Sequence, residues 1–231
     1  MVGGYGDDCP FTILGEEVVF EGKWLGTRCV SFIDPKTKAK GVWDCAYRTS
    51  CHGWIQTHHP RGVWDCAYRT SCRKDTEANG VVVIPILKKA GRKYFILVKQ
   101  YRIPIKGWSL EFPAGLMDQE GEAAETTAIR ELKEETGYIG NKILKKATKG
   151  KQYLNPGMSD DSVLYVIVEV DGDAPENQNP VQDLQEGECI EVKLIQCEEI
   201  LESMEKFKDD GIFIEALVQS FALGYVLAKD L

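Results

Sequence analysis

Arg130-Glu131-Leu132-Lys133-Glu134-Glu135-Thr136-Gly137-Tyr138 is the most informative stretch of this 231-residue chain. It closes a predicted helix that begins near Glu122 and stops at Gly137, a residue typical of helix C-termini. At 100° per residue, the three glutamates of the stretch fall within an arc of roughly 100° on one face of that helix. The opposite face is apolar and can pack against a sheet. The glutamates are Glu131, Glu134 and Glu135.

This concentration of carboxylates has two interpretations. Like charges three or four residues apart repel by a few tenths of a kcal/mol per pair, so the pattern does not stabilise an isolated helix. Oxygen ligands that converge on one point suit Mg²⁺, with Mn²⁺ as the alternative, and a bound cation would relieve the repulsion. A solvated acidic face is the other interpretation. The helix by itself leaves both open.

The surroundings of the helix favour the metal. Gly115, Glu122 and the stretch from Arg130 to Tyr138 resemble the Nudix box, which reads Gly, five residues, Glu, seven residues, then Arg-Glu-aliphatic-x-Glu-Glu-x-Gly-aliphatic. Residues 116–121 make the first gap six residues long here, and Tyr138 stands where an aliphatic residue is usual. The extra residue lies in the loop before the helix, and the glutamate triad is intact.

Three further segments are similar to the ADP-ribose/ADP-sugar pyrophosphatase branch of the Nudix family: Lys99–Pro104, Leu110–Gly115 and Leu154–Ser159. In that branch the backbone carbonyl at the Ala114 position joins the glutamates as a metal ligand. The resemblance also implies that Arg102 contacts the phosphates of the substrate. It makes Glu188, in the loop before the last strand, the catalytic base beside the catalytic carboxylates Glu134 and Glu135.

The same branch sandwiches adenine between tryptophans of the N-terminal region, often across a dimer. Trp24 fits the first of them. The second falls in a duplicated segment, so Trp43 and Trp64 compete for one role, as do Arg48 and Arg69. The second copy keeps the spacing to the catalytic domain and is mildly favoured. Its expected substrate contacts are Trp64, Asp65 and Arg69.

The duplication is exact: residues 41–51 recur letter for letter as residues 62–72. Solenoid repeats diverge and occur in three or more copies, whereas this pair is identical and solitary. It indicates a local duplication or an error in the gene model. The spacer contains Cys51, His52, His58 and His59. Each cysteine pair is separated by five residues, wider than structural zinc sites favour, so a zinc-binding arm over residues 41–72 is the weaker alternative.

The remaining pattern predicts an α+β fold, and the resemblance specifies an α/β/α sandwich with a mixed sheet. The expected domains are an N-terminal β region over residues 1–78, which contains the duplicated unit, and a Nudix hydrolase domain over residues 79–231. Expected strands cover residues 18–20, 30–33, 80–87, 94–98, 108–112, 163–170 and 190–195, and expected closing helices cover 198–208 and 214–228.

Charge and composition exclude several classes. The chain carries 28 Lys and Arg against 36 Asp and Glu, a net charge of −8. This balance argues against a nucleic-acid or anionic-membrane partner. No apolar run is long enough to span a bilayer. Asp7 and Asp8 stand where a signal peptide needs positive charge, so we expect a cytoplasmic protein, with the nucleus as an alternative, whose eight cysteines stay reduced.

The resemblance therefore implies a Mg²⁺-dependent enzyme that hydrolyses the diphosphate bond of ADP-ribose or an ADP-sugar to AMP and a sugar phosphate. Its partners would be this small nucleotide sugar and a second copy of the chain in a homodimer. One alternative is a Nudix hydrolase of other nucleoside diphosphate derivatives, such as oxidised nucleotides or NADH. The other is a non-catalytic ADP-ribose-binding module, whose mark would be the loss of a triad glutamate.

Overall fold

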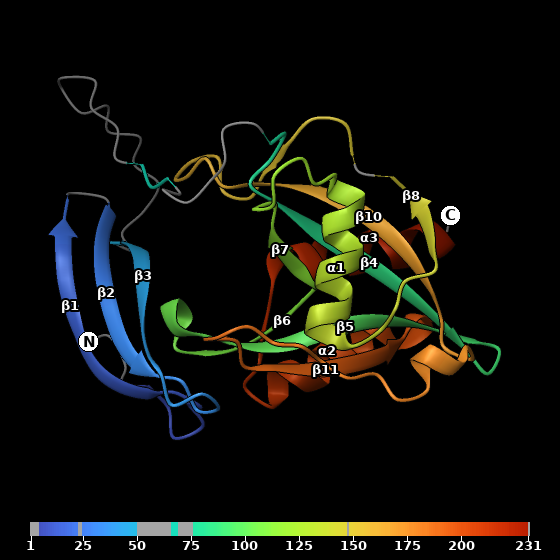
Figure 1. Ribbon diagram of the computed structural model, residues 1–231, viewed down its shortest axis with the longest axis horizontal. Coiled ribbons are helices and arrows are strands. Elements are labelled where there is room, and N and C mark those ends of the chain that lie inside the picture. The colour runs from blue at the N-terminus through green and yellow to red at the C-terminus, as the bar shows by residue number, and fades with distance from the viewer. Residues whose placement is uncertain (1–4, 23–24, 50–65, 69–75, 147, 231) are drawn as a thin grey trace. The chain divides into compact units, whose positions relative to one another are not determined.

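The computed structural model describes residues 5–22, 25–49, 66–68, 76–146 and 148–230 (Figure 1). The chain forms two compact units. The smaller unit takes Met1–Thr70, Ile103–Lys106 and Tyr153–Asp161, and the larger unit takes Ser71–Arg102, Gly107–Gln152 and Ser162–Leu231. Each unit is described separately below.

The larger unit is built on a mixed sheet. Its central strand β4 (Gly80–Lys89) pairs in parallel with β10 (Ser162–Asp171) and in antiparallel with β5 (Arg92–Arg102). β5 also pairs in antiparallel with β6 (Gly107–Glu111) and with β11 (Ile190–Gln196). Four short strands extend the sheet: β7 (Ala114–Leu116), β8 (Lys142–Lys145), β9 (Gln152–Tyr153) and β12 (Phe213–Ile214).

β4 and β5 form the hairpin that the sequence predicts. Lys89 pairs with Arg92, and the two residues between them, Ala90 and Gly91, both have positive φ, 49° and 74°. Two-residue turns with positive φ at both positions match the twist of the flanking strands, which is why they are common in hairpins. Gly91 adopts this conformation without steric cost.

Helices cover the two faces of the sheet (Figure 1). Alternate residues of β4 point to opposite faces. Val81 and Val83 pack in one cluster with Leu132 of α1 (Ala124–Thr136), whereas Val82 and Ile84 pack in a second cluster with α2 (Ile200–Asp209) and α3 (Ala216–Asp230). The predicted α+β sandwich with a mixed sheet is thereby confirmed. Short 3₁₀ turns lie at Ile103–Ile105, Pro175–Asn177 and Cys197–Glu199.

α1 ends where the sequence predicts. Gly137 has φ 75°, the left-handed conformation, and its N–H donates to the carbonyl of Lys133 at 2.8 Å. A Cβ at this glycine would also overlap the backbone of Pro180 and Val181. The helix begins at Ala124, two residues later than the expected start at Glu122. No side chain caps it at Ala123.

The smaller unit contains a three-stranded antiparallel sheet of β1 (Thr12–Glu21), β2 (Leu25–Ile33) and β3 (Lys40–Arg48). β3 is the first copy of the duplicated segment. The buried Arg28 donates to Glu16 at 3.0 Å and to the carbonyl of Pro104 at 3.1 Å. In the second copy only residues 66–68 are described, and there the N–H of Ala67 donates to the carbonyl of Met158 at 2.8 Å.

Several predicted residues lie outside the described part of the chain. They are the four expected N-terminal substrate contacts, Trp24, Trp64, Asp65 and Arg69, and the residues that raised the zinc alternative, Cys51, His52, His58 and His59. Among the described helices, none is long and apolar enough to cross a membrane.

Candidate active site

Glu131 and Glu135 lie on the side of α1 that packs against β7. Glu131 and Glu135 are only 5% and 4% exposed. The N–H of Ala114 donates to Glu135 Oε2 at 3.1 Å, and the carboxyl group of Glu131 lies where a Cβ of Gly115 would be. The short glycine-containing strand therefore lets the buried face of the helix bring two carboxylates against the backbone of the sheet.

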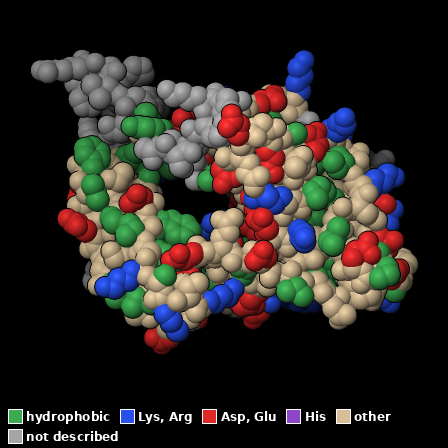
Figure 2. Space-filling model, in the orientation of Figure 1, with side chains coloured by type: hydrophobic (Ala, Val, Ile, Leu, Met, Phe, Trp, Pro, Cys, Tyr) green, Lys and Arg blue, Asp and Glu red, His purple; other side chains and the backbone are tan. Residues whose placement is uncertain are grey.

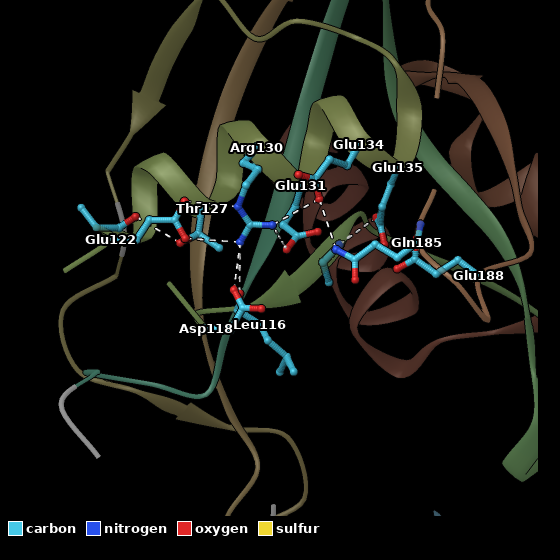
Figure 3. A network of polar contacts seen from close by, with 12 residues as sticks. Leu116, Asp118, Glu122, Thr127, Arg130, Glu131, Glu134, Glu135, Gln185 and Glu188 are labelled. Carbon is cyan, nitrogen blue, oxygen red and sulfur yellow. Dashed lines mark hydrogen bonds and ion pairs between the residues drawn. The ribbon is translucent and has the colours of Figure 1, made fainter. Parts of the chain in front are cut away.

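One arginine holds the carboxylates together. The guanidinium of Arg130 reaches Glu131 Oε1 at 2.7 Å, Glu134 Oε2 at 3.2 Å and Glu122 Oε1 at 3.2 Å (Figure 3). Nη2 of Arg130 also lies 3.6 Å from Asp118 Oδ1. Burial opposes the charge of Arg130, but the hydrogen bond to Glu122 and the charge of Glu131 raise its pKa above the ordinary value. Arg130 is thus an internal counter-ion for this acidic face.

Arg130 does not neutralise the whole cluster. Burial raises the pKa of Glu131 to about 7, against the opposing effect of Arg130, and the charges of Glu134 and Glu188 add to the rise. Burial, followed by the charges of Glu188 and Glu131, raises the pKa of Glu135 well above its usual range. Four carboxylates therefore act on one another across a small, partly buried region.

Such a donor set fits a divalent cation. Carboxylate oxygens are hard ligands of the kind that Mg²⁺ and Mn²⁺ prefer, and a cation would offset both the burial and the carboxylate repulsion that raise the two pKa values. Within the described residues, no group of three or more His, Cys, Asp or Glu side chains is gathered closely enough to hold a metal ion. Glu131 and Glu134 instead point their oxygens at Arg130, and Glu135 accepts from Ala114.

Glu188 reaches the cluster from the loop before β11. Its Oε2 accepts from the backbone N–H of Gln185 at 2.8 Å, and the side-chain amide of Gln185 lies 3.5 Å from Glu134 Oε2 (Figure 3). The structure therefore places the loop carboxylate beside the helix carboxylates, although 53 positions separate Glu188 from Glu135 in the chain. Sequence reasoning missed Gln185, because a glutamine in a polar loop has no distinguishing spacing.

Arg102 lies at the end of β5 and forms an ion pair with Glu111. Its Nε and Nη2 donate to Glu111 at 3.0 and 2.6 Å, a bidentate pair. Burial opposes the charge of Arg102, but Glu111, and more weakly Glu135 and Glu215, raise its pKa above the ordinary value. Burial and the charge of Glu111 raise the pKa of Glu215 to about 7. The expected phosphate-binding arginine is thus electrostatically coupled to Glu135 of the helix.

The larger unit therefore brings together six of the residues singled out in the sequence: Arg102, Ala114, Glu131, Glu134, Glu135 and Glu188. The role of Arg130 as the counter-ion of Glu131 and Glu134 was missed. Its position was a usable signal, because Arg130 lies four residues before Glu134 and eight after Glu122. Residues three or four apart on a helix are neighbours.

The class of protein follows from this combination of a mixed sheet between helices and an acidic helix that packs on a glycine-containing strand. Residues 76–217 match the NUDIX domain. The chain belongs to the Nudix hydrolase family.

Relatives extend over nearly the whole chain. "Putative nudix hydrolase 2" of Caenorhabditis elegans is 40% identical over 96% of this chain and 88% of its own length. "ADP-ribose pyrophosphatase" of Saccharomyces cerevisiae is 36% identical over 90% of this chain and 79% of its own length. "ADP-sugar pyrophosphatase" of Mus musculus is 29% identical over 91% and 85%, respectively.

Proposed function

We propose that this Nudix hydrolase is an ADP-sugar diphosphatase. It hydrolyses the diphosphate bond of ADP-ribose, or of a related ADP-sugar, to AMP and a sugar phosphate. The observation that carries the proposal is the buried pair Glu131 and Glu135 facing Glu188. The names of the yeast and mouse relatives support the choice of substrate class.

The proposed cofactor is Mg²⁺, and its ligands are carboxylate oxygens of Glu131, Glu134 and Glu135 together with the carbonyl of Ala114. A bound divalent cation supplies positive charge that neutralises the phosphate oxygens of the substrate. The raised pKa values of Glu131 and Glu135 support this assignment, because burial and the neighbouring carboxylates both oppose the ionisation of these groups, and a bound cation would favour it. Arg130 contacts the carboxylates of Glu131 and Glu134 and so limits where these side chains point.

Two residues of the chain serve the reacting groups. Glu188 accepts the proton of the water molecule that attacks phosphorus, and the N–H of Gln185 holds its carboxylate at 2.8 Å. Arg102 stabilises charge on the phosphates. An arginine has five N–H donors, so the bonds from Nε and Nη2 to Glu111 leave donors available, including both on Nη1.

The proposal includes the N-terminal region. Residues 1–78 would supply adenine contacts from Trp24, Trp64, Asp65 and Arg69, and would carry the homodimer contacts. Residues 79–231 would carry the hydrolase chemistry. Trp43, in β3, is the competing partner for adenine, since the two copies of the repeat are identical.

Hydrolysis of a substrate panel tests the proposed function. ADP-ribose with Mg²⁺ should yield AMP and ribose 5-phosphate, and chelation by EDTA should abolish turnover until Mg²⁺ is restored. ADP-glucose, ADP-mannose, an oxidised nucleotide and NADH complete the panel, with products separated by chromatography. Faster hydrolysis of the oxidised nucleotide or NADH would replace the ADP-sugar assignment. Binding of ADP-ribose without any product would assign the chain to a non-catalytic module.

Gly115→Ala should displace the carboxyl group of Glu131 without destabilising the fold. The new methyl group would occupy the place of the Glu131 carboxyl group, which is the end of a flexible side chain and can move. We expect kcat to fall about 10- to 100-fold, since small displacements of ligands are costly. Thermal unfolding should change little, and retained activity would contradict the close packing.

Gly224→Ala is the matched control for this substitution. Gly224 lies in α3, and a Cβ there would meet nothing within 4 Å. Activity should be unchanged, while the free energy of unfolding should rise by roughly 0.5–1 kcal/mol, because alanine favours the helix over glycine.

A further inference from the structure

The connection that carries Glu188 is attached to the last turn of α1. Helix ends leave backbone carbonyls without intrahelical partners. At the end of α1 the N–H of Asp183 donates to the carbonyl of Glu134 at 2.8 Å, and the side-chain amide of Gln182 donates to the carbonyl of Glu135 at 2.6 Å. The loop therefore satisfies two consecutive carbonyls of the residues whose carboxylates form the acidic cluster.

Gln182 also reaches the strand that follows Glu188. The same Nε2 lies 3.3 Å from the carbonyl of Ile190, the first residue of β11. A primary amide has two N–H donors, so a single nitrogen can satisfy both carbonyls. Gln182 thus joins α1 to β11 across the loop. In the chain, Glu188 lies between Gln182 and Ile190, two residues before Ile190.

A further contact fixes the register of the loop on the helix. Gly137, which ends α1, lies so close to Pro180 and Val181 that a Cβ would overlap their backbone. The loop is therefore held against the helix end just before Gln182, at Gln182 and at Asp183. Beyond Asp183, the residues 184–187 lead to Glu188, whose own turn is closed by its N–H donating to the carbonyl of Gln185 at 3.2 Å.

We propose that Gln182 is a positioning residue for Glu188: its amide ties the loop to Glu135 and Ile190 and so sets the distance of the Glu188 carboxylate from the helix glutamates. The inference rests on the proposed function, in which Glu188 is the base. Gln182 acts through backbone carbonyls and has no contact with the reacting groups in this scheme. Losing its two donors leaves the fold intact and lets the base move away from the attacking water.

Gln182→Ala and the near-isosteric Gln182→Met are the test variants. With ADP-ribose and Mg²⁺, each should lower kcat by about 10-fold or more and leave KM nearly unchanged, because displacement of a catalytic group by about 1 Å is costly while substrate contacts remain. The methionine variant keeps the side-chain volume if the alanine variant folds poorly. A change confined to KM would overturn the proposal.

Gln178→Ala is the matched control. Gln178 belongs to the same connection between β10 and β11, and its side-chain amide likewise donates to a backbone carbonyl, that of Gly172 at 3.0 Å. The bond joins Gln178 to Gly172 within this connection and does not reach α1 or Glu188. Activity of this variant should equal that of the parent. A loss as large as that of Gln182→Ala would show a general effect of loosening the connection and would overturn the specific role.

A double-mutant cycle decides whether Gln182 acts through Glu188. In the background of Glu188→Gln, Gln182→Ala should cause no further loss of kcat, since there is no base left to position. A further loss equal to that in the parent would identify independent structural damage and overturn the proposal. If Glu188→Gln alone is fully active, the base role in the proposed function fails, whatever Gln182 does.

Hydrogen exchange tests the attachment without any activity. In metal-free Gln182→Ala, the amides of Asp183 and Gln185 should exchange faster than in the parent, because the loop opens more often. The amide of Leu132, in the middle of α1, should be unaffected. Unchanged exchange at Asp183 and Gln185 would show that Gln182 does not hold the loop. This readout separates a failed anchor from a failed base.

Discussion

Glu135→Gln should lower kcat for ADP-ribose hydrolysis by on the order of 10³-fold, because a metal ligand supplies several kcal/mol of charge stabilisation and each 1.4 kcal/mol is a factor of ten. Glutamine keeps the volume of the side chain and an oxygen that can accept from the N–H of Ala114. It removes the negative charge that the cation needs. Turnover in the presence of Mg²⁺ should fall, and the affinity for Mg²⁺, measured by calorimetry, should also fall.

The fold of this variant should be preserved. Glu135 is buried beside Glu131 and Glu188, whose charges oppose its ionisation, so removal of its charge should leave the melting temperature of the metal-free protein unchanged or higher. Glu125→Gln, in the first turn of the same helix, is the control and should retain full activity. Near-full activity of Glu135→Gln would end the assignment of the metal to this face of α1.

Glu188→Gln should lower kcat by about 10²- to 10⁴-fold, the range expected for loss of a general base. The amide oxygen can still accept from the N–H of Gln185, so the loop should keep its conformation and KM should change little. This variant differs from Glu135→Gln in one decisive respect: it should still bind Mg²⁺ with nearly the parent affinity. Calorimetric titration with Mg²⁺ distinguishes the two roles.

Glu186→Gln provides the control for the loop. Glu186 is exposed and lies two residues before Glu188, so the substitution removes the same charge from the same loop. Its kcat should equal that of the parent. If Glu188→Gln proved as active as this control, the proton acceptor would have to be another group.

The main elements follow from the sequence because local rules dominate them. The helical period and the stop at Gly137 predict α1 to within two residues, and the apolar run from residue 80 predicts a strand buried on both faces, as β4 is. β1 was predicted only at residues 18–20. Nine of its ten residues are exposed. Its sequence therefore has no alternation of apolar and polar residues from which the full strand could be predicted.

The chemistry of the site could be predicted only in part from the sequence. The spacing of Glu131, Glu134 and Glu135 identifies a shared face, but whether those charges meet an arginine or a cation depends on side-chain rotamers that spacing does not determine. The structure pairs two of them with Arg130. Gln182 was inaccessible for another reason, since it contacts a backbone carbonyl 47 positions away, and backbone acceptors are the same at every residue.

The parallel pairing of β4 with β10 has a consequence for the order of events during synthesis. Gly80 pairs with Val163 and Lys88 with Asp171, so partners in the middle of the sheet are 83 residues apart. Pairings of high sequence separation form slowly, because a long loop must close before any contact is gained. A nascent chain that has β4 but lacks β10 therefore presents one unpaired edge of a strongly apolar strand. Folding of the hydrolase unit must wait until residue 171 has left the ribosome, and chaperones that shield strand edges should act in that interval.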